Sequence, residues 1–338
     1  AVKIKEGFIF DGGCIIDTYN KLLLTEGFMW APKFHQSFLH KNEDTDNPNI
    51  EISGISKEPL YRSLSKKNFV NAAFIGAGLY VNFGHWLMEF APRIFMLKKV
   101  LKEKNISTVL ISDNVPDRFL FFFENKLGKE ISIERYSHKE VINFENLWVI
   151  ESPVYRDKQN ILHFNFDGMR ETKKIVHSSI HSSNKENTIL FLGRTGETHR
   201  NIINQSEIVS ELLSLSDNLI EENSMHTKTM EEQINLIASS KMIIEAAGGT
   251  TVLTNNIISN RTPYLLLVTP DRTHDAGRKY MATHGISPGW LIGKNTSDEQ
   301  KHFLLDKDLY FDKTSVLKSA KLMGSEFFGN QISAYSYI

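Results

Sequence analysis

Cysteine is nearly absent from this sequence, because Cys14 is the only one in 338 residues. A single cysteine cannot form an intramolecular disulfide, so we expect a chain that folds in a reducing compartment such as the cytoplasm. Cys14 lies in an apolar run (Gly13-Cys14-Ile15-Ile16), and this setting favours a small buried side chain over a reactive nucleophile.

Long apolar runs and an excess of either charge are also lacking. No stretch approaches the roughly 18 continuous apolar residues of a membrane span, and no basic-then-apolar leader opens the sequence. We therefore expect neither a transmembrane helix nor a signal peptide. The 39 basic and 40 acidic residues give a formal net charge of -1, which excludes an overall basic field, so we expect no nucleic-acid partner.

Metal-binding motifs are equally scarce. There is no cysteine pair and no His-x-x-x-His with a glutamate. Asp44-Thr45-Asp46 fits Asp-x-Asp by letter, but it lies in a polar, turn-rich stretch that we interpret as a solvated loop. Asp271 with His274-Asp275 forms a second small polar cluster. We expect no metal and no cofactor.

Alternating strand and helix patterns dominate what is present. Short apolar runs predict strands, and apolar residues at helical spacing predict helices between them. The first series has strands over 71–76, 108–111, 131–136 and 147–150, with helices over 85–104 and 117–127. The second has strands over 188–192, 218–221, 241–245 and 264–268, with helices over 206–215, 229–239 and 251–258, and a last helix over 314–328. Such alternation predicts an α/β fold of two parallel-sheet domains.

Two segments of the second series point to a phosphate ligand. Arg194 follows the strand over 188–192, and Arg200 lies six residues later; two guanidinium forks there can clamp a diphosphate, or they can be surface arginines in a flexible loop. Gly248, Gly249, Thr250 and Thr251 connect a strand to a helix, whose N-terminal N–H groups attract anions. The alternative is an ordinary tight turn. Neither segment fits the P-loop or the dinucleotide fingerprint.

A third segment, in the first series, offers a general base. His85 opens a predicted helix, and Glu89 follows one turn later on the same face. A histidine in this position can accept a proton near neutral pH. The alternatives are a capping or packing histidine, and an ion pair between Glu89 and Arg93.

Together these segments resemble glycosyltransferase family 61, including its bacterial members of capsule and surface polysaccharide assembly. The likeness covers about residues 70 to 270, and three blocks carry it in order. They are Gly84-His85-Trp86 with Glu89 and Pro92-Arg93; Arg194 with Arg200-Asn201-Ile202-Ile203-Asn204; and Glu232-Gln233 through Ala238 to Leu253-Thr254-Asn255. One block departs from the family, because the sequence reads Gly248-Gly249-Thr250-Thr251-Val252 where many members carry His-Gly-Ala-Gly.

The resemblance implies a GT-B-like architecture, in which two Rossmann-like domains face a cleft, and an inverting, metal-independent transfer. The expected domains are an acceptor-side domain over 1–170, a nucleotide-sugar-binding domain over 171–310 and a helical tail over 311–338 that packs back on the N-terminal domain. His85 and Glu89 are the expected catalytic residues. The expected donor-binding residues are Arg194, Arg200, Asn204, Glu232, Gly248, Gly249, Thr250, Thr251 and Asn255.

The function expected on this basis is transfer of a hexosyl, N-acetylhexosaminyl or pentosyl group from a nucleotide-sugar, of which a UDP-sugar is the first choice, to a glycan hydroxyl in surface or capsular polysaccharide synthesis. The alternatives are a GT-B enzyme with a CMP-linked acidic sugar and a non-catalytic nucleotide or glycan binder. We expect a bacterial cytoplasmic protein, with a peripheral position at the inner face of the membrane, a biosynthetic complex and a homodimer as open possibilities.

Overall fold

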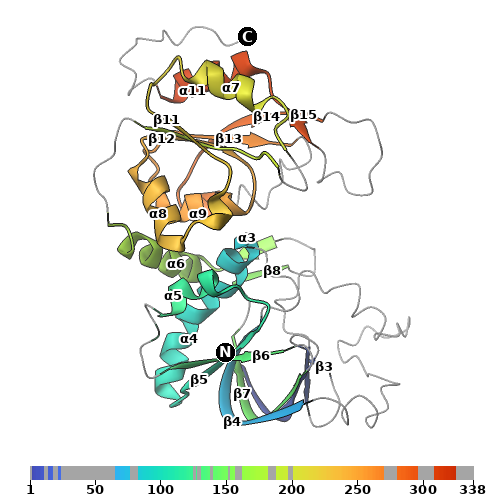
Figure 1. Cartoon of the computed structure of the whole chain (residues 1–338). Coiled ribbons are helices and arrows are strands. Elements are labelled where there is room, and N and C mark those ends of the chain that lie inside the picture. Colours follow the sequence, from blue (N-terminus) through green and yellow to red (C-terminus); the bar gives the residue numbers. More distant parts are fainter. Residues whose placement is uncertain are drawn as a thin grey trace. The chain divides into compact units, whose positions relative to one another are not determined.

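A computed structural model of the chain (Figure 1) divides into two compact units, Ala1–Thr172 and Lys173–Ile338, each of which is described by itself. The structure describes residues 2–10, 14–17, 22–23, 65–76, 83–124, 127, 131–137, 140–150, 153–156, 162–181, 188–196, 201–269, 280–295 and 308–324. None of the helices in these ranges combines the length and the apolarity needed to cross a bilayer.

The first unit is built on a seven-stranded mixed sheet with the order β3-β2-β1-β7-β4-β5-β6. Four neighbouring strands are parallel: β7 (Glu140–Val149), β4 (Ser65–Gly76), β5 (Thr108–Ser112) and β6 (Ser132–Tyr136). Three N-terminal strands, which the sequence patterns did not predict, extend the sheet beyond β7, and each pairs antiparallel with its neighbour: β1 (Val2–Phe10), β2 (Cys14–Asp17) and β3 (Leu22–Leu23). The first unit is therefore mixed α/β, with a parallel half and an antiparallel half.

The helix predicted over 85–104 is present but is not regular. It consists of α3 (Phe83–His85), a π-helical segment over Trp86–Phe90 and α4 (Ala91–Glu103). Pro92 lies in the first turn of α4 and has no N–H to donate, which breaks the regular α-helical ladder at this point. Trp86 anchors the π-helical segment, since its ring stacks on Phe119 and Phe123 and its Nε1 donates to the Phe119 carbonyl at 3.1 Å.

Smaller elements complete the first unit. The helix predicted over 117–127 is a 3₁₀ turn, Asp117–Leu120, followed by α5 (Phe121–Glu124). A two-stranded ribbon of β8 (Val154–Arg156) and β9 (Leu162–Phe164) precedes α6 (Phe166–Ser178), the helix in which the division between the units falls.

The second unit is a doubly wound α/β domain. The five strands of its main sheet are all parallel, in the order β11-β10-β12-β13-β14. The strands predicted from apolar runs are confirmed as β10 (Ile189–Leu192), β11 (Leu219–Glu222), β12 (Met242–Ala246) and β13 (Tyr264–Val268), and β14 (Gly289–Ile292) forms the edge. Buried strands of this kind require cover on both faces of the sheet.

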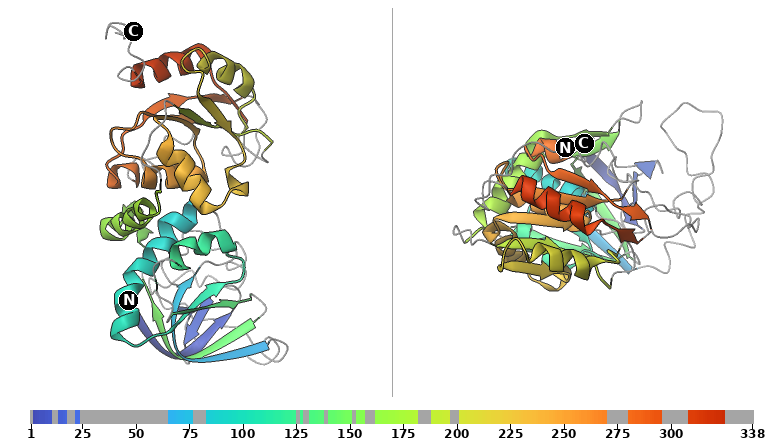
Figure 2. Two further views of the ribbon diagram at one scale, coloured as in Figure 1. Left: turned by 60° about the vertical axis from the view of Figure 1, so that its left-hand side comes forward. Right: turned by 90° about the horizontal axis from the view of Figure 1, so that it is seen from above.

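Helices provide that cover (Figure 1). One face carries α7 (Gln205–Leu212), and the other carries α8 (Met230–Ser239) and α9 (Gly249–Ile257). The capping box predicted for α8 is confirmed, because Thr229 accepts from the Glu232 N–H while the Glu232 carboxylate accepts from the Thr229 N–H. Figure 2 shows the same layers from two other directions.

The C-terminal helix corrects one expectation. Its described part is α11 (Lys313–Met323), which packs against α7, β13 and β14 of the second unit. Val316 and Ala320 of α11 are fully buried in the same hydrophobic core as Ile208 of α7. This helix is therefore part of the second unit's core, and the expected tail that packs back on the N-terminal domain is wrong for these residues.

Candidate functional site

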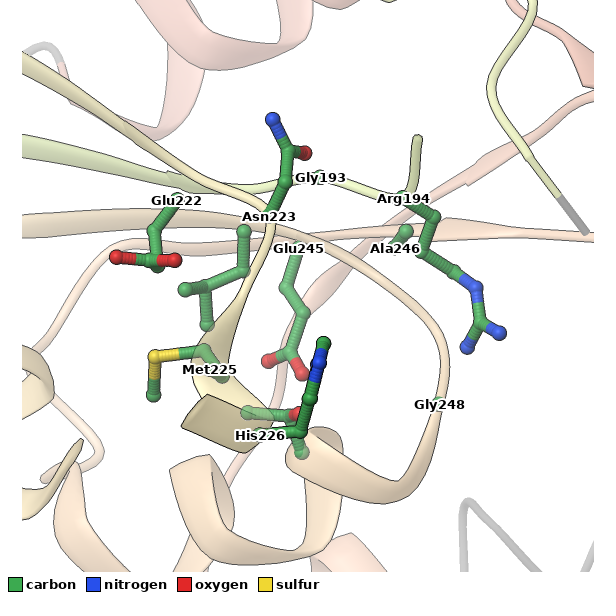
Figure 3. A pocket seen from close by; sticks show the side chains of 11 residues that line it. Gly193, Arg194, Glu222, Asn223, Met225, His226, Glu245, Ala246 and Gly248 are labelled. Carbon is green, nitrogen blue, oxygen red and sulfur yellow. The ribbon is translucent and has the colours of Figure 1, made fainter. Parts of the chain in front are cut away.

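The pocket that we take as the candidate site lies where the strand order of the second sheet reverses. Counted along the chain from β10, the order is 2-1-3-4-5, so β10 and β12 are neighbours whose connections run to opposite sides. Ligands of open α/β sheets bind at this switch point, beyond the carboxyl ends of the strands. The pocket follows that rule, since its lining comes from the ends of β10, β11 and β12 (Figure 3).

One side of the pocket is suited to an anion. Gly248 and Thr250 belong to the turn and first residues of α9, whose N-terminal N–H groups have no partners within the helix. Arg194 follows β10 and extends beside this turn, so that a Cβ built on Gly248 would lie 2.8 Å from Arg194 Nη1. The absence of a side chain at Gly248 thus leaves room for the guanidinium.

A buried carboxyl group supports the same turn from below. The Thr251 hydroxyl accepts from the Gly248 N–H at 2.9 Å and donates to Glu245 Oε1 at 3.1 Å. The Tyr264 hydroxyl donates to Glu245 Oε2 at 2.9 Å. Burial raises the pKa of Glu245 to about 7, although hydrogen bonds from Tyr264 and Thr251 oppose the shift. This carboxyl group therefore changes its protonation state near neutral pH, and Thr251 connects it to the turn at Gly248.

The raised pKa of Glu245 predicts a pH-dependent stability. The pKa of Glu245 is about 7 in the folded protein and 4.5 in the unfolded chain. The protonated carboxyl group therefore stabilises the fold fully below pH 4.5, and this stabilisation is lost as the pH rises through about 7. We expect Glu245→Gln to gain about 2–3 kcal/mol relative to the wild type between pH 5 and pH 8, at about 1.4 kcal/mol per pKa unit. Urea unfolding of both proteins at several pH values measures this gain, and a difference that stays constant with pH would contradict it.

The residues after β11 were missed by sequence reasoning. Glu222, Asn223, Met225 and His226 line the pocket opposite Arg194 (Figure 3). Burial disfavours ionisation of Glu222, but hydrogen bonds from Ser224 and the Lys228 ammonium outweigh it and hold the pKa of this carboxyl below its usual value. Their position at the end of a predicted strand was the one sequence feature that could have pointed to the pocket. That feature identifies them as pocket residues only when β11 is known to lie beside β10.

Several residues expected at the donor site lie elsewhere in the second unit. The Asn204 amide donates to the Phe311 carbonyl at 2.7 Å and accepts from the Phe311 N–H, so it joins the start of α7 to the chain before α11. Glu232 is exposed in the first turn of α8, where its carboxylate completes the capping box with Thr229. Asn255 is fully buried in α9 and donates to the Thr251 carbonyl. None of the three lines the pocket, and Arg200 lies outside the described residues.

The expected catalytic pair in the first unit does come together. His85 Nδ1 lies 2.5 Å from Glu89 Oε1, with side-chain exposures of 33% and 5% respectively. The π-helical segment between α3 and α4 carries Glu89, and π-helical segments are frequent at functional sites. A buried carboxylate that accepts from Nδ1 fixes the tautomer and the orientation of the imidazole.

Arg93 takes a different role from the expected ion pair. Its Nε donates to the backbone carbonyl of Glu89 at 2.8 Å, and its Nη1 donates to the Ile75 carbonyl at 3.1 Å. Burial lowers the pKa of this guanidinium to about 10, against the opposing charge of Glu89. Arg93 therefore ties the π-helical segment to the end of β4, and the Glu89 carboxylate is left to His85.

Within the parts of the chain that the structure describes, no three His, Cys, Asp or Glu side chains gather as a metal site would require. The acidic pair Asp44 and Asp46 and the cluster of Asp271, His274 and Asp275 lie outside the described residues.

The second unit is thus a doubly wound α/β domain whose switch-point pocket is lined by Arg194 and by the start of α9. A family model described as Glycosyltransferase 61 matches residues 83–260, which include both the His85–Glu89 pair and the pocket. The chain belongs to this family and is a glycosyltransferase, which acts on a sugar donor and an acceptor. A search of curated proteins found no match.

Proposed function

We propose that this glycosyltransferase transfers a sugar from a UDP-sugar to a glycan hydroxyl with inversion and without a metal, in bacterial surface or capsular polysaccharide synthesis. The observation that carries the proposal is the switch-point pocket, in which Arg194 and the N-terminus of α9 meet at one anion site. The GT-B arrangement expected from the sequence and a cytoplasmic location belong to the same proposal.

The donor's diphosphate is the part of the substrate that fits this anion site. A diphosphate leaving group gains negative charge as the glycosidic bond breaks, and fixed cations and N–H groups aimed at it lower the barrier. Arg194 supplies a guanidinium, and Gly249 to Thr251 supply helix N-terminal amides. In this proposal these groups provide the charge compensation that a metal ion provides in other transferases. Arg200 stays a proposed second arginine of the clamp.

The acceptor hydroxyl requires a base, and we assign this role to His85 oriented by Glu89. The Nε2 lone pair takes the hydroxyl proton while the oxygen forms a bond to the anomeric carbon. The bond from that carbon to the phosphate oxygen breaks, and the nucleoside diphosphate leaves with the electron pair. The contact of 2.5 Å between Nδ1 and Oε1 supports this assignment, because a carboxylate placed there stabilises the imidazolium that forms.

A thermal-shift panel of UDP, GDP, CMP and NAD, each with and without EDTA, tests the donor assignment. We expect UDP at about 100 times its Kd to add about 2.7 kcal/mol to the free energy of unfolding, and EDTA to leave that gain unchanged. Stabilisation by CMP alone would move the enzyme to CMP-linked donors, and stabilisation by NAD alone would overturn the proposal. Slow release of UDP from a matching UDP-sugar then separates an enzyme from a non-catalytic binder.

A further inference from the structure

A buried amide side chain joins two of the three strand ends that form the pocket. Gln205, the first residue of α7, is 2% exposed. Its Oε1 accepts from the Arg194 backbone N–H at 2.8 Å. Its Nε2 donates to Glu221 Oε1 at 2.5 Å and to Asn223 Oδ1 at 2.7 Å. One side chain thus links the end of β10, where Arg194 lies, to the end of β11, where Asn223 lies.

The local packing shows that this link is closely fitted. Gly193 precedes Arg194, and a Cβ added to Gly193 would collide with the Gln205 amide and with the Asn223 carboxamide oxygen. The amide therefore lies directly against the backbone that carries Arg194. A bare backbone at Gly193 is what allows this approach.

From this geometry we infer that Gln205 is a positioning residue of the donor site, which holds Arg194 and Asn223 in the arrangement that receives the nucleotide diphosphate. The inference rests on the proposed function for the identity of the ligand. Gln205 itself does not line the pocket, so its effect passes through the two residues that do. Positioning of this kind determines affinity because a loosely held guanidinium must be ordered at the moment of binding.

The neighbouring residue Asn204 provides a matched control. It is also a buried amide at the start of α7, 5% exposed, but its hydrogen bonds run to the Phe311 backbone and away from the pocket. Loss of Asn204 therefore removes buried amide hydrogen bonds of the same kind in the same segment. It leaves the hydrogen bonds that hold Arg194 and Asn223 at their strand ends in place.

The test compares Gln205→Met, which keeps the length of the side chain without its hydrogen bonds, with Asn204→Ala. Hydrogen exchange is measured first, without ligand. We expect faster exchange at residues 193–196 and 221–224 in Gln205→Met, and at 309–316 in Asn204→Ala. Unchanged exchange at residues 193–196 in Gln205→Met would overturn the inference, whether or not the protein binds UDP.

Calorimetric titration with UDP is the second readout. We expect about a ten-fold weaker affinity for Gln205→Met, and a change below about two-fold for Asn204→Ala. In Gln205→Glu the carboxylate still accepts from the Arg194 N–H, but it is repelled by the neighbouring Glu221 carboxylate. Protonation at low pH relieves this repulsion, so the affinity of the variant relative to the wild type should recover from pH 8 to pH 5. Equal losses in Gln205→Met and Asn204→Ala would reduce Gln205 to a general structural role. Failure of the wild type to bind UDP refutes the proposed donor and leaves the exchange result to decide on Gln205.

Discussion

We expect the His85→Ala variant to lose about 10²- to 10⁴-fold in kcat at saturating donor, the usual effect of removing a general base. Its affinity for UDP should stay near that of the wild type, because the proposed diphosphate site is built from residues of the second unit. Glu89→Gln should lose less, since a neutral amide still contacts Nδ1 but stabilises the imidazolium poorly. Single-turnover rates with saturating UDP-sugar measure both effects.

His181 provides the matched control for this prediction. It forms a histidine–glutamate pair with Glu231 at 3.0 Å, and both side chains are more than half exposed. His181→Ala should keep full turnover, because exposed pairs of this kind contribute little. A His85→Ala variant as active as His181→Ala would refute the base assignment.

The second large effect is expected at Arg194. We expect Arg194→Ala to lose about 10²- to 10³-fold in kcat and to bind UDP more weakly, because the guanidinium stabilises charge on the leaving phosphate. Arg194→Lys should recover only part of the loss, since an ammonium group lacks the planar fork that matches phosphate oxygens. Steady-state kinetics with donor varied, together with UDP titration, measures the two components.

Arg261 serves as the control arginine of the same unit, because it is exposed and does not line the pocket. Arg261→Ala should leave both UDP affinity and kcat within about two-fold of the wild type, as is usual for surface substitutions. If Arg194→Ala behaves in the same way, Arg194 does not clamp the diphosphate.

The strands and helices of the second unit could largely be predicted, because short local sequence patterns specify them. Its core strands are short apolar runs, fully buried in β12 and β13, and the start of α8 carries its own capping box at Thr229. Arg194 and the turn at Gly248 could be placed at the carboxyl ends of strands, where the pocket lies, because each follows a predicted strand within three residues.

The parts that were missed depend on long-range contacts. Strand β1 acquires its place only by pairing with β7, about 140 residues later in the sequence, and nothing local specifies this partner. In the same way, Asn223 and His226 become pocket residues only because β11 lies beside β10. Asn204 and Glu232 were expected at the donor site. The hydrogen bond from Asn204 to the Phe311 carbonyl and the place of Glu232 in the capping box of α8 explain the two residues without a ligand.

The central claim is that a nucleoside diphosphate binds at the N-terminus of α9, beside Arg194. The most direct measurement is the change in backbone amide NMR signals as UDP is added, with uridine as the control that lacks phosphate. We expect the signals of Arg194, Gly249 and Thr250 to shift with UDP to saturation and to stay nearly unchanged with uridine. Shifts confined to other residues, or equal shifts with uridine, would contradict it.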